Sequence, residues 1–315
     1  MGNWNPINQG VSVSMLNLWL QDKFACKTSY LDGWEMVESW NHALNYGNLV
    51  QAGIEGWVKT QQKKGLLRFI QTEYKKQVNQ YGDCDDMRWW TSLACHQTQL
   101  FVDHYTNDRH LPLSSVHTSE RNVRVSIELP SKRKVTLNCY LDGEGDNLIM
   151  ENKVRGKYDP ESIAGEIKWD LQYNFYLLAV YNEKGELPRK VWYQHSRRPG
   201  SWGYKGPRKK KSETDSEYLE RVKEHMTENP DYYFYRYIGR PTLTDLKRFC
   251  HACLYPMLEA FIDWYDYCTK TTNDVNRVDW MTPYGLYNPF VEGTSERFRN
   301  YRMTGLPTGL KKKAR

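Results

Sequence analysis

The sequence contains no long hydrophobic run. No apolar stretch within its 315 residues approaches the roughly 20 residues that a membrane-spanning helix needs. The N-terminal residues also lack the basic start and apolar stretch of a secretory signal peptide, and the serine or threonine of a myristoylation site. We therefore expect the protein to work inside a cell, in the cytoplasm.

Other familiar patterns are missing as well. The seven cysteines are odd in number and irregularly spaced, which argues against a disulfide framework and fits a reducing compartment. His96 and His104 lie in an apparent aromatic helix without the partner spacing of a metal site. No G-x-x-x-x-G-K-[ST] loop is present, which argues against a nucleotide-hydrolysing enzyme.

Positive charge exceeds negative charge by six, and it is unevenly placed. One basic run is Arg208–Lys211, and a second begins at Lys311 near the end of the chain. Such runs favour binding to polyanions such as nucleic acids. A solvated loop and a solvated tail are the alternative interpretation of each run taken separately.

The periodicity of apolar residues predicts an α/β protein with helices first and a sheet later. Helical spacing predicts early helices over residues 12–20, 43–60, 59–80 and 87–105. Alternation predicts three antiparallel strands over residues 120–128, 135–141 and 148–154. The expected later elements are a helix over 161–181, strands over 189–195 and 232–238, and helices over 217–229 and 244–270, the last capped by Thr244 and bent near Pro256.

The most informative stretch is an expected hairpin over residues 135–154, with turn residues at 143–147. Asp142 ends its first strand, and Glu151 and Lys153 lie two apart on the same face of the second. Two carboxylates suit a hard divalent cation, and a neighbouring lysine can orient or deprotonate water. Taken alone, these residues also fit a charged hairpin that faces solvent.

The order Asp142, Glu151, Asn152, Lys153 resembles the core of the PD-(D/E)XK nuclease superfamily, in which an Asp leads into a hairpin and (D/E)-x-K follows. Gln172 and Tyr176, four apart on the next helix, resemble the Q-x-x-x-Y signature of its RecB-like branch. The fold that this resemblance implies is restriction-endonuclease-like, a mixed sheet flanked by helices with a helical N-terminal part. We therefore expect one domain over 1–315, with helical (1–112), catalytic (113–198), basic-loop (199–216) and C-terminal helical (217–315) parts.

An earlier helix departs from the family pattern at one position. Gly47, Gln51 and Glu55 resemble the G-x-x-x-H-x-x-x-E motif of RecB-like nucleases, with Gln in place of His. Because an amide is a poorer metal ligand than an imidazole, we expect Gln51 to contact a metal weakly, through water, or not at all. Glu55 keeps the glutamate position, although an ordinary helix carboxylate is the simpler interpretation.

The segment from Tyr193 to Pro199 is similar to the Tyr-x-x-x-Arg-Arg/Lys-Pro ending of phage-encoded members. Arg197 and Arg198 are therefore candidates for phosphate contact, with surface charge at a strand end as the alternative. The loop that follows mixes aromatics with cations, a composition that can stack unpaired bases and follow a nucleic-acid backbone. Its candidate DNA-binding residues are Arg208, Lys209, Lys210 and Lys211.

The resemblance implies a Mg²⁺- or Mn²⁺-dependent deoxyribonuclease, an exonuclease of phage recombination or replication that acts on DNA in the bacterial host cytoplasm. Asp142, Glu151 and the backbone carbonyl of Asn152 would hold the metal, which lowers the pKa of its water. Glu55 would join the metal shell or bind a second ion. Lys153 would activate the water.

The remaining implied roles belong to the next helix and to partners. Gln172 would orient Lys153 and the water, and Tyr176 would touch the phosphate strand. A homo-oligomer or a recombination partner protein is compatible with the family. Two other functions stay open: a nuclease-fold DNA-binding protein with weakened catalysis, which only Gln51 favours, and an RNA-directed nuclease.

Some RecB-like nucleases hold an iron–sulfur cluster with one early and three late cysteines. This chain has four such cysteines, namely Cys26, Cys250, Cys253 and Cys268. The last three lie inside an apparent helix with an apolar packing face. We therefore expect buried thiols at these positions and no cluster.

Overall fold

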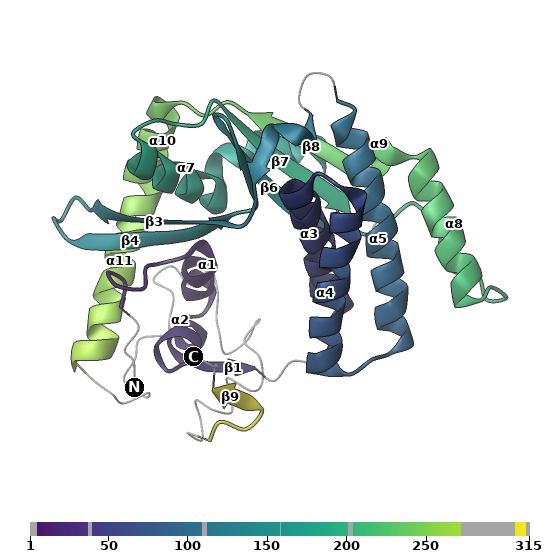
Figure 1. Ribbon diagram of the computed structural model, residues 1–315. Helices are drawn as coiled ribbons and strands as arrows, with labels where there is room; N and C mark the ends of the chain where they lie inside the picture. The colour runs from purple at the N-terminus through teal and green to yellow at the C-terminus, as the bar shows by residue number, and fades with distance from the viewer. Residues whose placement is uncertain are drawn as a thin grey trace.

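A five-stranded mixed sheet lies at the centre of the molecule (Figure 1). The computed structural model describes residues 5–36, 40–108, 112–157, 159–200, 204–271 and 306–312. The spatial order of the central strands is β2 (Val116–Thr118), β5 (Gly143–Gly145), β6 (Leu148–Arg155), β7 (Lys190–Arg197) and β8 (Phe234–Gly239). The expected mixed sheet flanked by helices is therefore confirmed.

The strand β6 has one antiparallel and one parallel neighbour. It pairs antiparallel with β5 and parallel with β7, and β7 pairs antiparallel with β8. A two-residue turn joins β5 to β6, with Asn147 in the left-handed region (φ 54°) that asparagine tolerates well. Because β6 and β7 run parallel, the chain must cross from the end of β6 back to the start of β7, and helical segments make this connection.

The long strands β3 (Arg121–Glu128) and β4 (Lys134–Leu141) form a separate antiparallel ribbon. The predicted antiparallel pairing of the strands over 120–128 and 135–141 is therefore confirmed. The predicted pairing of the third strand with the second was wrong, because β6 pairs with β5 and β7 and not with β4. Residues expected only as a turn extend instead into β5. Gly145 permits this, since a Cβ there would lie 1.9 Å from the Ser115 carbonyl oxygen on the neighbouring segment.

The predicted N-terminal helices are present. Ser12 caps α1 by accepting a hydrogen bond from the Met15 amide at 3.3 Å. The helix expected over 59–80 begins later than predicted, because Gln61 adopts a left-handed conformation (φ 55°) that ends the preceding helix. The early elements are α1 (Val13–Gln21), α2 (Lys23–Cys26), β1 (Trp34–Met36), α3 (His42–Thr60), α4 (Lys63–Tyr81) and α5 (Asp85–Thr106).

The helix expected over 161–181 is divided. A short α6 (Pro160–Glu166) and a 3₁₀ turn (Ile167–Trp169) precede α7 (Leu171–Lys184), which Asp170 caps through the Tyr173 amide at 2.7 Å. The capping aspartate competes with helix continuation, because its side chain binds the backbone of the new first turn. The predicted single helix was wrong at this point.

The C-terminal helices also follow the prediction with corrections. The capping box of Thr214 and Glu217 begins α8 (Asp215–Glu228) as expected, and the one-turn α9 (Pro230–Tyr233) precedes β8. Thr242, and not Thr244, caps α10 (Leu243–Phe249), and a π-helical turn (Cys250–Leu254) separates it from α11 (Tyr255–Asp266) just before Pro256.

The second basic run lies partly in β9 (Leu310–Lys312), which pairs with β1. Lys311 contacts Glu35 there at 3.3 Å. Of the predicted C-terminal part over 217–315, residues 272–305 and 313–315 lie outside the described residues. Within the described residues, no helix combines the length and apolar character needed to cross a membrane.

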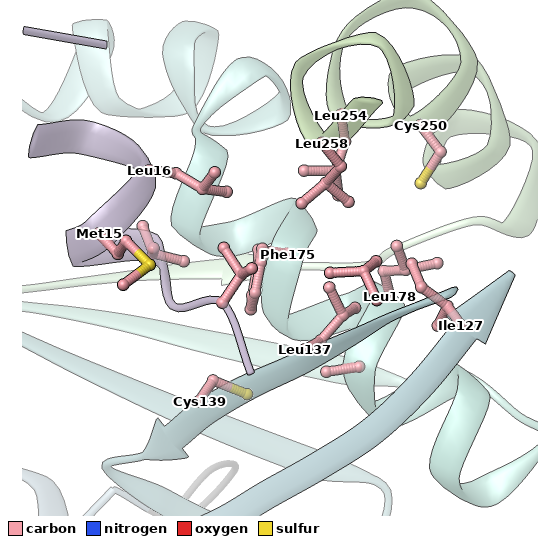
Figure 2. Packing of buried hydrophobic residues seen from close by; sticks show 14 of the residues in the cluster. Met15, Leu16, Ile127, Leu137, Cys139, Phe175, Leu178, Cys250, Leu254 and Leu258 are labelled. Atoms are coloured by element: carbon pink, nitrogen blue, oxygen red, sulfur yellow. The ribbon is translucent and has the colours of Figure 1, made fainter. Parts of the chain in front are cut away.

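The faces of the sheet belong to different hydrophobic clusters. Ile149 and Val191 join a cluster with α1, α7, the α10–α11 region and the β3–β4 ribbon. Figure 2 shows its centre, where Phe175 and Leu178 of α7 lie between the ribbon and the C-terminal helices. Met150 and Trp192, on alternate positions of the same strands, pack with α3, α4 and α5. Strands β6 and β7 are thus buried on both faces.

Candidate active site

The alternation of β6 places Glu151 and Lys153 on the face that α7 covers. Ile149 lies on this face and Met150 on the opposite one, as their different clusters show. Glu151 is only 5% exposed, although carboxylates are rarely buried without partners. Its position is therefore a costly one that needs specific compensation.

Gln172, in the first turn of α7, connects the side chains of this face. Its Nε2 donates to Glu151 Oε1 at 2.6 Å and to the Tyr176 hydroxyl oxygen at 2.9 Å, while its Oε1 accepts from Lys153 Nζ at 2.6 Å. Lys153 Nζ also lies 2.5 Å from Glu151 Oε1. The amide suits this place because it offers donors and an acceptor together.

Asp142 reaches the same region from between β4 and β5. Its Oδ2 accepts a hydrogen bond from the Asn152 backbone N–H at 2.7 Å, which holds the carboxylate beside β6. The structure therefore brings Asp142, Glu151, Lys153, Gln172 and Tyr176 together, as the sequence predicted. The predicted metal contact of the Asn152 carbonyl stays a prediction.

Both carboxyl groups have raised pKa values. Burial raises the pKa of Asp142 well above its ordinary value, and the charge of Glu151 raises it further. Burial also raises the pKa of Glu151, although Lys153 opposes this effect. Because burial disfavours the charged form of both groups, additional positive charge beside them would be stabilising.

The donor set fits a divalent metal in one specific respect. Glu151 Oε2 is buried, and it has no hydrogen-bond partner within the described part of the chain. One free carboxylate oxygen beside a second carboxylate matches the one or two protein carboxylates that typically hold Mg²⁺ together with water and substrate oxygens. Among the described residues, no three His, Cys, Asp or Glu side chains converge closely enough to form a complete metal cage.

Gln51 reaches the site indirectly, through a residue that sequence reasoning missed. Its Nε2 donates to Glu120 Oε1 at 3.0 Å. The register of the ribbon pairs Arg121 with Leu141, so Glu120 and Asp142 lie one position beyond this pair. The charge of Glu120 is accordingly among those that raise the pKa of Asp142. The expected antiparallel strands over 120–128 and 135–141 were the signal that could have placed Glu120 opposite Asp142.

Glu55 has a different partner. It forms an ion pair with Lys59, one turn further along α3, and its side chain is 20% exposed. This is the arrangement of an ordinary helix carboxylate, and such i,i+4 pairs are common on helix surfaces. Its role in a metal shell stays a prediction.

The strand β7 adds His195, which sequence reasoning missed, and Tyr193, which it named only as the start of a motif segment. Tyr193 and His195 stand opposite Glu151 and Lys153 in the parallel β6–β7 pair. Burial lowers the pKa of His195 to about 3, with the charges of Arg155 and Lys153 acting in the same direction. Burial and nearby acids raise the pKa of Tyr193. Both rings are therefore neutral at physiological pH.

The two predicted phosphate-binding arginines are held against the body of the protein. The Arg197 guanidinium lies 4.5 Å from the centre of the Tyr232 ring, and its Nε donates to the Tyr232 carbonyl at 3.0 Å. Arg198 is half-buried, and burial lowers its pKa. Both arginines are only partly exposed, which differs from the alternative of a simple surface charge at a strand end.

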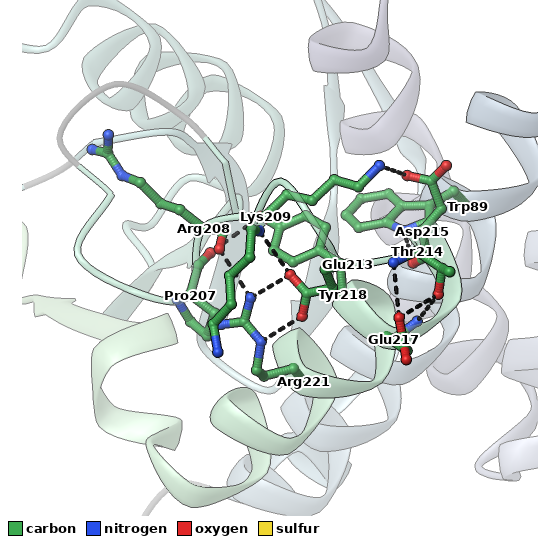
Figure 3. A network of polar contacts seen from close by, with 11 residues as sticks. Trp89, Pro207, Arg208, Lys209, Glu213, Thr214, Asp215, Glu217, Tyr218 and Arg221 are labelled. Atoms are coloured by element: carbon green, nitrogen blue, oxygen red, sulfur yellow. Dashed lines mark hydrogen bonds and ion pairs between the residues drawn. The ribbon is translucent and has the colours of Figure 1, made fainter.

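The basic loop is hydrogen-bonded to α8 (Figure 3). Arg221 donates to the Arg208 carbonyl at 2.9 Å and pairs with Glu213 at 2.6 Å. Lys209 pairs with Asp215 at 2.7 Å. The side chain of Arg208 points away from this network, and Lys210 and Lys211 are exposed. The loop therefore presents some cations to solvent from an anchored backbone.

No known protein-family model matches the chain, and no curated protein matches it. The resemblance to RecB-like nucleases therefore depends on the motif residues alone.

Proposed function

We propose that the protein is a Mg²⁺- or Mn²⁺-dependent deoxyribonuclease, and specifically an exonuclease. The observation that carries this proposal is the meeting of Glu151 and Lys153 at the amide of Gln172, with Asp142 held beside the same strand by the Asn152 backbone N–H. A lysine that contacts a carboxylate of a candidate metal site is well placed for phosphodiester hydrolysis, because its ammonium group can orient the attacking water.

Asp142 and Glu151 would hold the metal, and Glu151 Oε2 is the oxygen left available for it. When bound, the metal supplies a polarised scissile phosphate and a water of lowered pKa. Lys153 would orient this water through one hydrogen of its ammonium group, while its contacts with Glu151 and Gln172 fix the nitrogen in place. Attack of the water oxygen would form one P–O bond and break the P–O bond to the leaving sugar oxygen. The proton lost by the water would balance the one taken up by the leaving oxygen, so the products are a phosphate monoester and a hydroxyl.

Tyr176 would contribute a hydrogen bond to the substrate phosphate. Burial and the charge of Glu151 raise its pKa, so the hydroxyl keeps its proton. Its oxygen already accepts from Gln172, which leaves the hydroxyl hydrogen to be donated. Arg208, Lys210 and Lys211 would add attraction to the DNA backbone from the loop.

Of the two alternative functions, only one is disfavoured by the geometry of this site. A DNA-binding protein without catalysis would have no need of Lys153 held between Glu151 and Gln172 in a buried site. An RNA-directed nuclease would use the same metal and water chemistry, so the sugar preference rests on the family resemblance. Assays with DNA and RNA of one sequence distinguish these two substrates directly.

The test compares end-labelled linear DNA with closed circular DNA in the presence of Mn²⁺. We expect the wild type to degrade the linear substrate and Lys153→Ala to be slower by roughly 100-fold or more, the usual contribution of a positioned acid–base group. Lys64→Ala, at an exposed position of α4, serves as the matched control and should retain wild-type rates. Undiminished cleavage by Lys153→Ala would contradict the proposed site.

A further inference from the structure

Two buried polar atoms on paired positions of neighbouring strands lack hydrogen bonds within the described part of the chain. They are Glu151 Oε2 and the hydroxyl oxygen of Tyr193. Glu151 is 5% exposed and Tyr193 is 3% exposed. A buried polar group that makes no hydrogen bond is destabilising, so two of them in the lining of one cavity call for a common partner.

The two side chains are neighbours by register. Glu151 and Tyr193 are directly opposite in the parallel pair of β6 and β7. Side chains at paired positions of adjacent strands project from the same face of a sheet. In agreement with this, the charge of Glu151 is among the causes that raise the pKa of Tyr193.

A small cavity lies between β6, β7 and α7, and both residues line it. Gln172 and Tyr176 contribute further polar wall, and Ile149 and Val191 contribute apolar wall. About 10 Å³ of the cavity is open to the centre of a water molecule. A buried water needs about 10–15 Å³ measured in this way and two to four polar partners. The cavity therefore has the size and the lining for one water.

We propose that this cavity binds a single water molecule that accepts a hydrogen bond from the Tyr193 hydroxyl and donates one to Glu151 Oε2. The neutral phenol is the natural donor to the water. The water in turn is a donor to the carboxylate, which can only accept when ionised. Tyr193 is then a positioning residue that acts on Glu151 through this water.

The bridge has a consequence for metal binding, and this part rests on the proposed function. The hydrogen bond from the water fixes the rotation of the Glu151 carboxylate and uses only one lone pair of Oε2. The fixed carboxylate is thereby prepared to hold a divalent cation. Removal of the hydroxyl alone should therefore weaken the binding of a metal ion without changing either carboxylate.

The first experiment measures thermal unfolding of the full chain in the presence of a chelator. If the water bridge exists, Tyr193→Phe lowers the midpoint of unfolding, because the water loses a partner and Glu151 Oε2 loses its donor. Tyr140→Phe, at a 56% exposed position of β4, is the matched control and should leave the midpoint unchanged. A midpoint for Tyr193→Phe that is equal to or above that of the wild type would show a hydroxyl with no partner and overturn the proposal.

The second experiment titrates the folded variants with MnCl₂ by calorimetry. We expect the dissociation constant of Tyr193→Phe to rise about tenfold, the equivalent of about 1.4 kcal/mol, while Tyr140→Phe matches the wild type. An unchanged constant for Tyr193→Phe would overturn the positioning role. If the wild type itself fails to bind Mn²⁺, the proposed nuclease function fails, and the unfolding comparison still decides whether the water site exists.

Discussion

At the scale of single residues, the amide of Gln172 orients the ion pair of Glu151 and Lys153. It donates to Glu151 and Tyr176 and accepts from Lys153, so each neighbour meets the complementary end of one group. A glutamate at this position would lose both donors and add a third carboxylate beside Glu151. The geometry therefore specifies an amide and not simply a polar side chain.

His195 makes a prediction about acid stability. Its pKa is about 3 in the folded state and about 6.5 in the unfolded chain, so unfolding takes up a proton between these values. A histidine with a lowered folded pKa contributes stability above the unfolded pKa, and this stability is lost as the pH falls through the folded pKa. We expect a loss of up to about 1.4 kcal/mol of unfolding free energy per pH unit in this window.

Urea unfolding of His195→Gln between pH 7 and pH 3 measures this contribution. The unfolding free energy of the variant should fall less steeply with decreasing pH than that of the wild type. His117→Gln, at an exposed position of β2, should keep the wild-type slope. Parallel slopes for wild type and His195→Gln would show that His195 is not held neutral by burial.

The sequence predicted some site residues well and others not at all. Glu151 with Lys153 and Gln172 with Tyr176 follow local spacing, because two-residue and four-residue intervals fix a shared face of a strand or helix. The order of the motif residues, and not spacing, added Asp142. The places of Tyr193 and His195 beside Glu151 and Lys153 depend on the parallel pairing of β6 with β7, about which local periodicity carries no information.

At the scale of elements, the start of α7 controls the site. The continuous helix expected from the sequence would have placed Gln172 in mid-helix, whereas Asp170 begins a new helix two residues before it. Apolar spacing runs through both α6 and α7, and only the capping chemistry of Asp170 divides them. Capping chemistry also sets the start of α10 at Leu243, where the Thr242 hydroxyl oxygen accepts from the Asp245 amide.

We expect Asp170→Ala to lower the unfolding free energy by about 1 kcal/mol and to slow Mn²⁺-dependent cleavage, because the cap fixes the turn that carries Gln172. Asp170→Ser should restore most of both properties. Thr214→Ala, which removes the cap of α8, should cost similar stability and leave cleavage intact. Equal cleavage rates for Asp170→Ala and Thr214→Ala would show that the cap of α7 does not position the catalytic residues.

The basic loop makes a prediction about salt dependence. Arg208, Lys210 and Lys211 are exposed, whereas Lys209 is paired with Asp215. Replacement of these three exposed residues by Ala should reduce the slope of log affinity against log salt by up to about three, roughly one for each phosphate contact. Anisotropy of labelled DNA with a chelator present measures this slope.

The control for this prediction removes the same charge from another surface. The triple alanine variant at Lys64, Lys75 and Lys76 changes exposed positions of α4. It should keep the wild-type slope, since general electrostatic attraction is a smaller effect than direct counterion release. If both triple variants lose the same slope, the loop has no special part in DNA binding.

At the scale of the whole molecule, the sheet joins two hydrophobic clusters, and the candidate site lies where β6 meets α7. The fold class was predictable because helices and strands differ in period and because strands buried on both faces need helices on each side. The order of strands was not predictable. Nothing local in the sequence indicates the short strand β5 or the parallel pairing of β7 with β6. Side chains at β6 were therefore predicted better than the sheet around them.

The central claim is that Asp142 and Glu151 together hold a divalent cation, and calorimetric titration of the metal-free protein with MnCl₂ tests it most directly. We predict saturable binding by the wild type and by Glu186→Gln, an exposed control, with loss of at least about tenfold in affinity, or about 1.4 kcal/mol, for Asp142→Asn and for Glu151→Gln. Binding by both site variants with the affinity of the wild type would contradict the account.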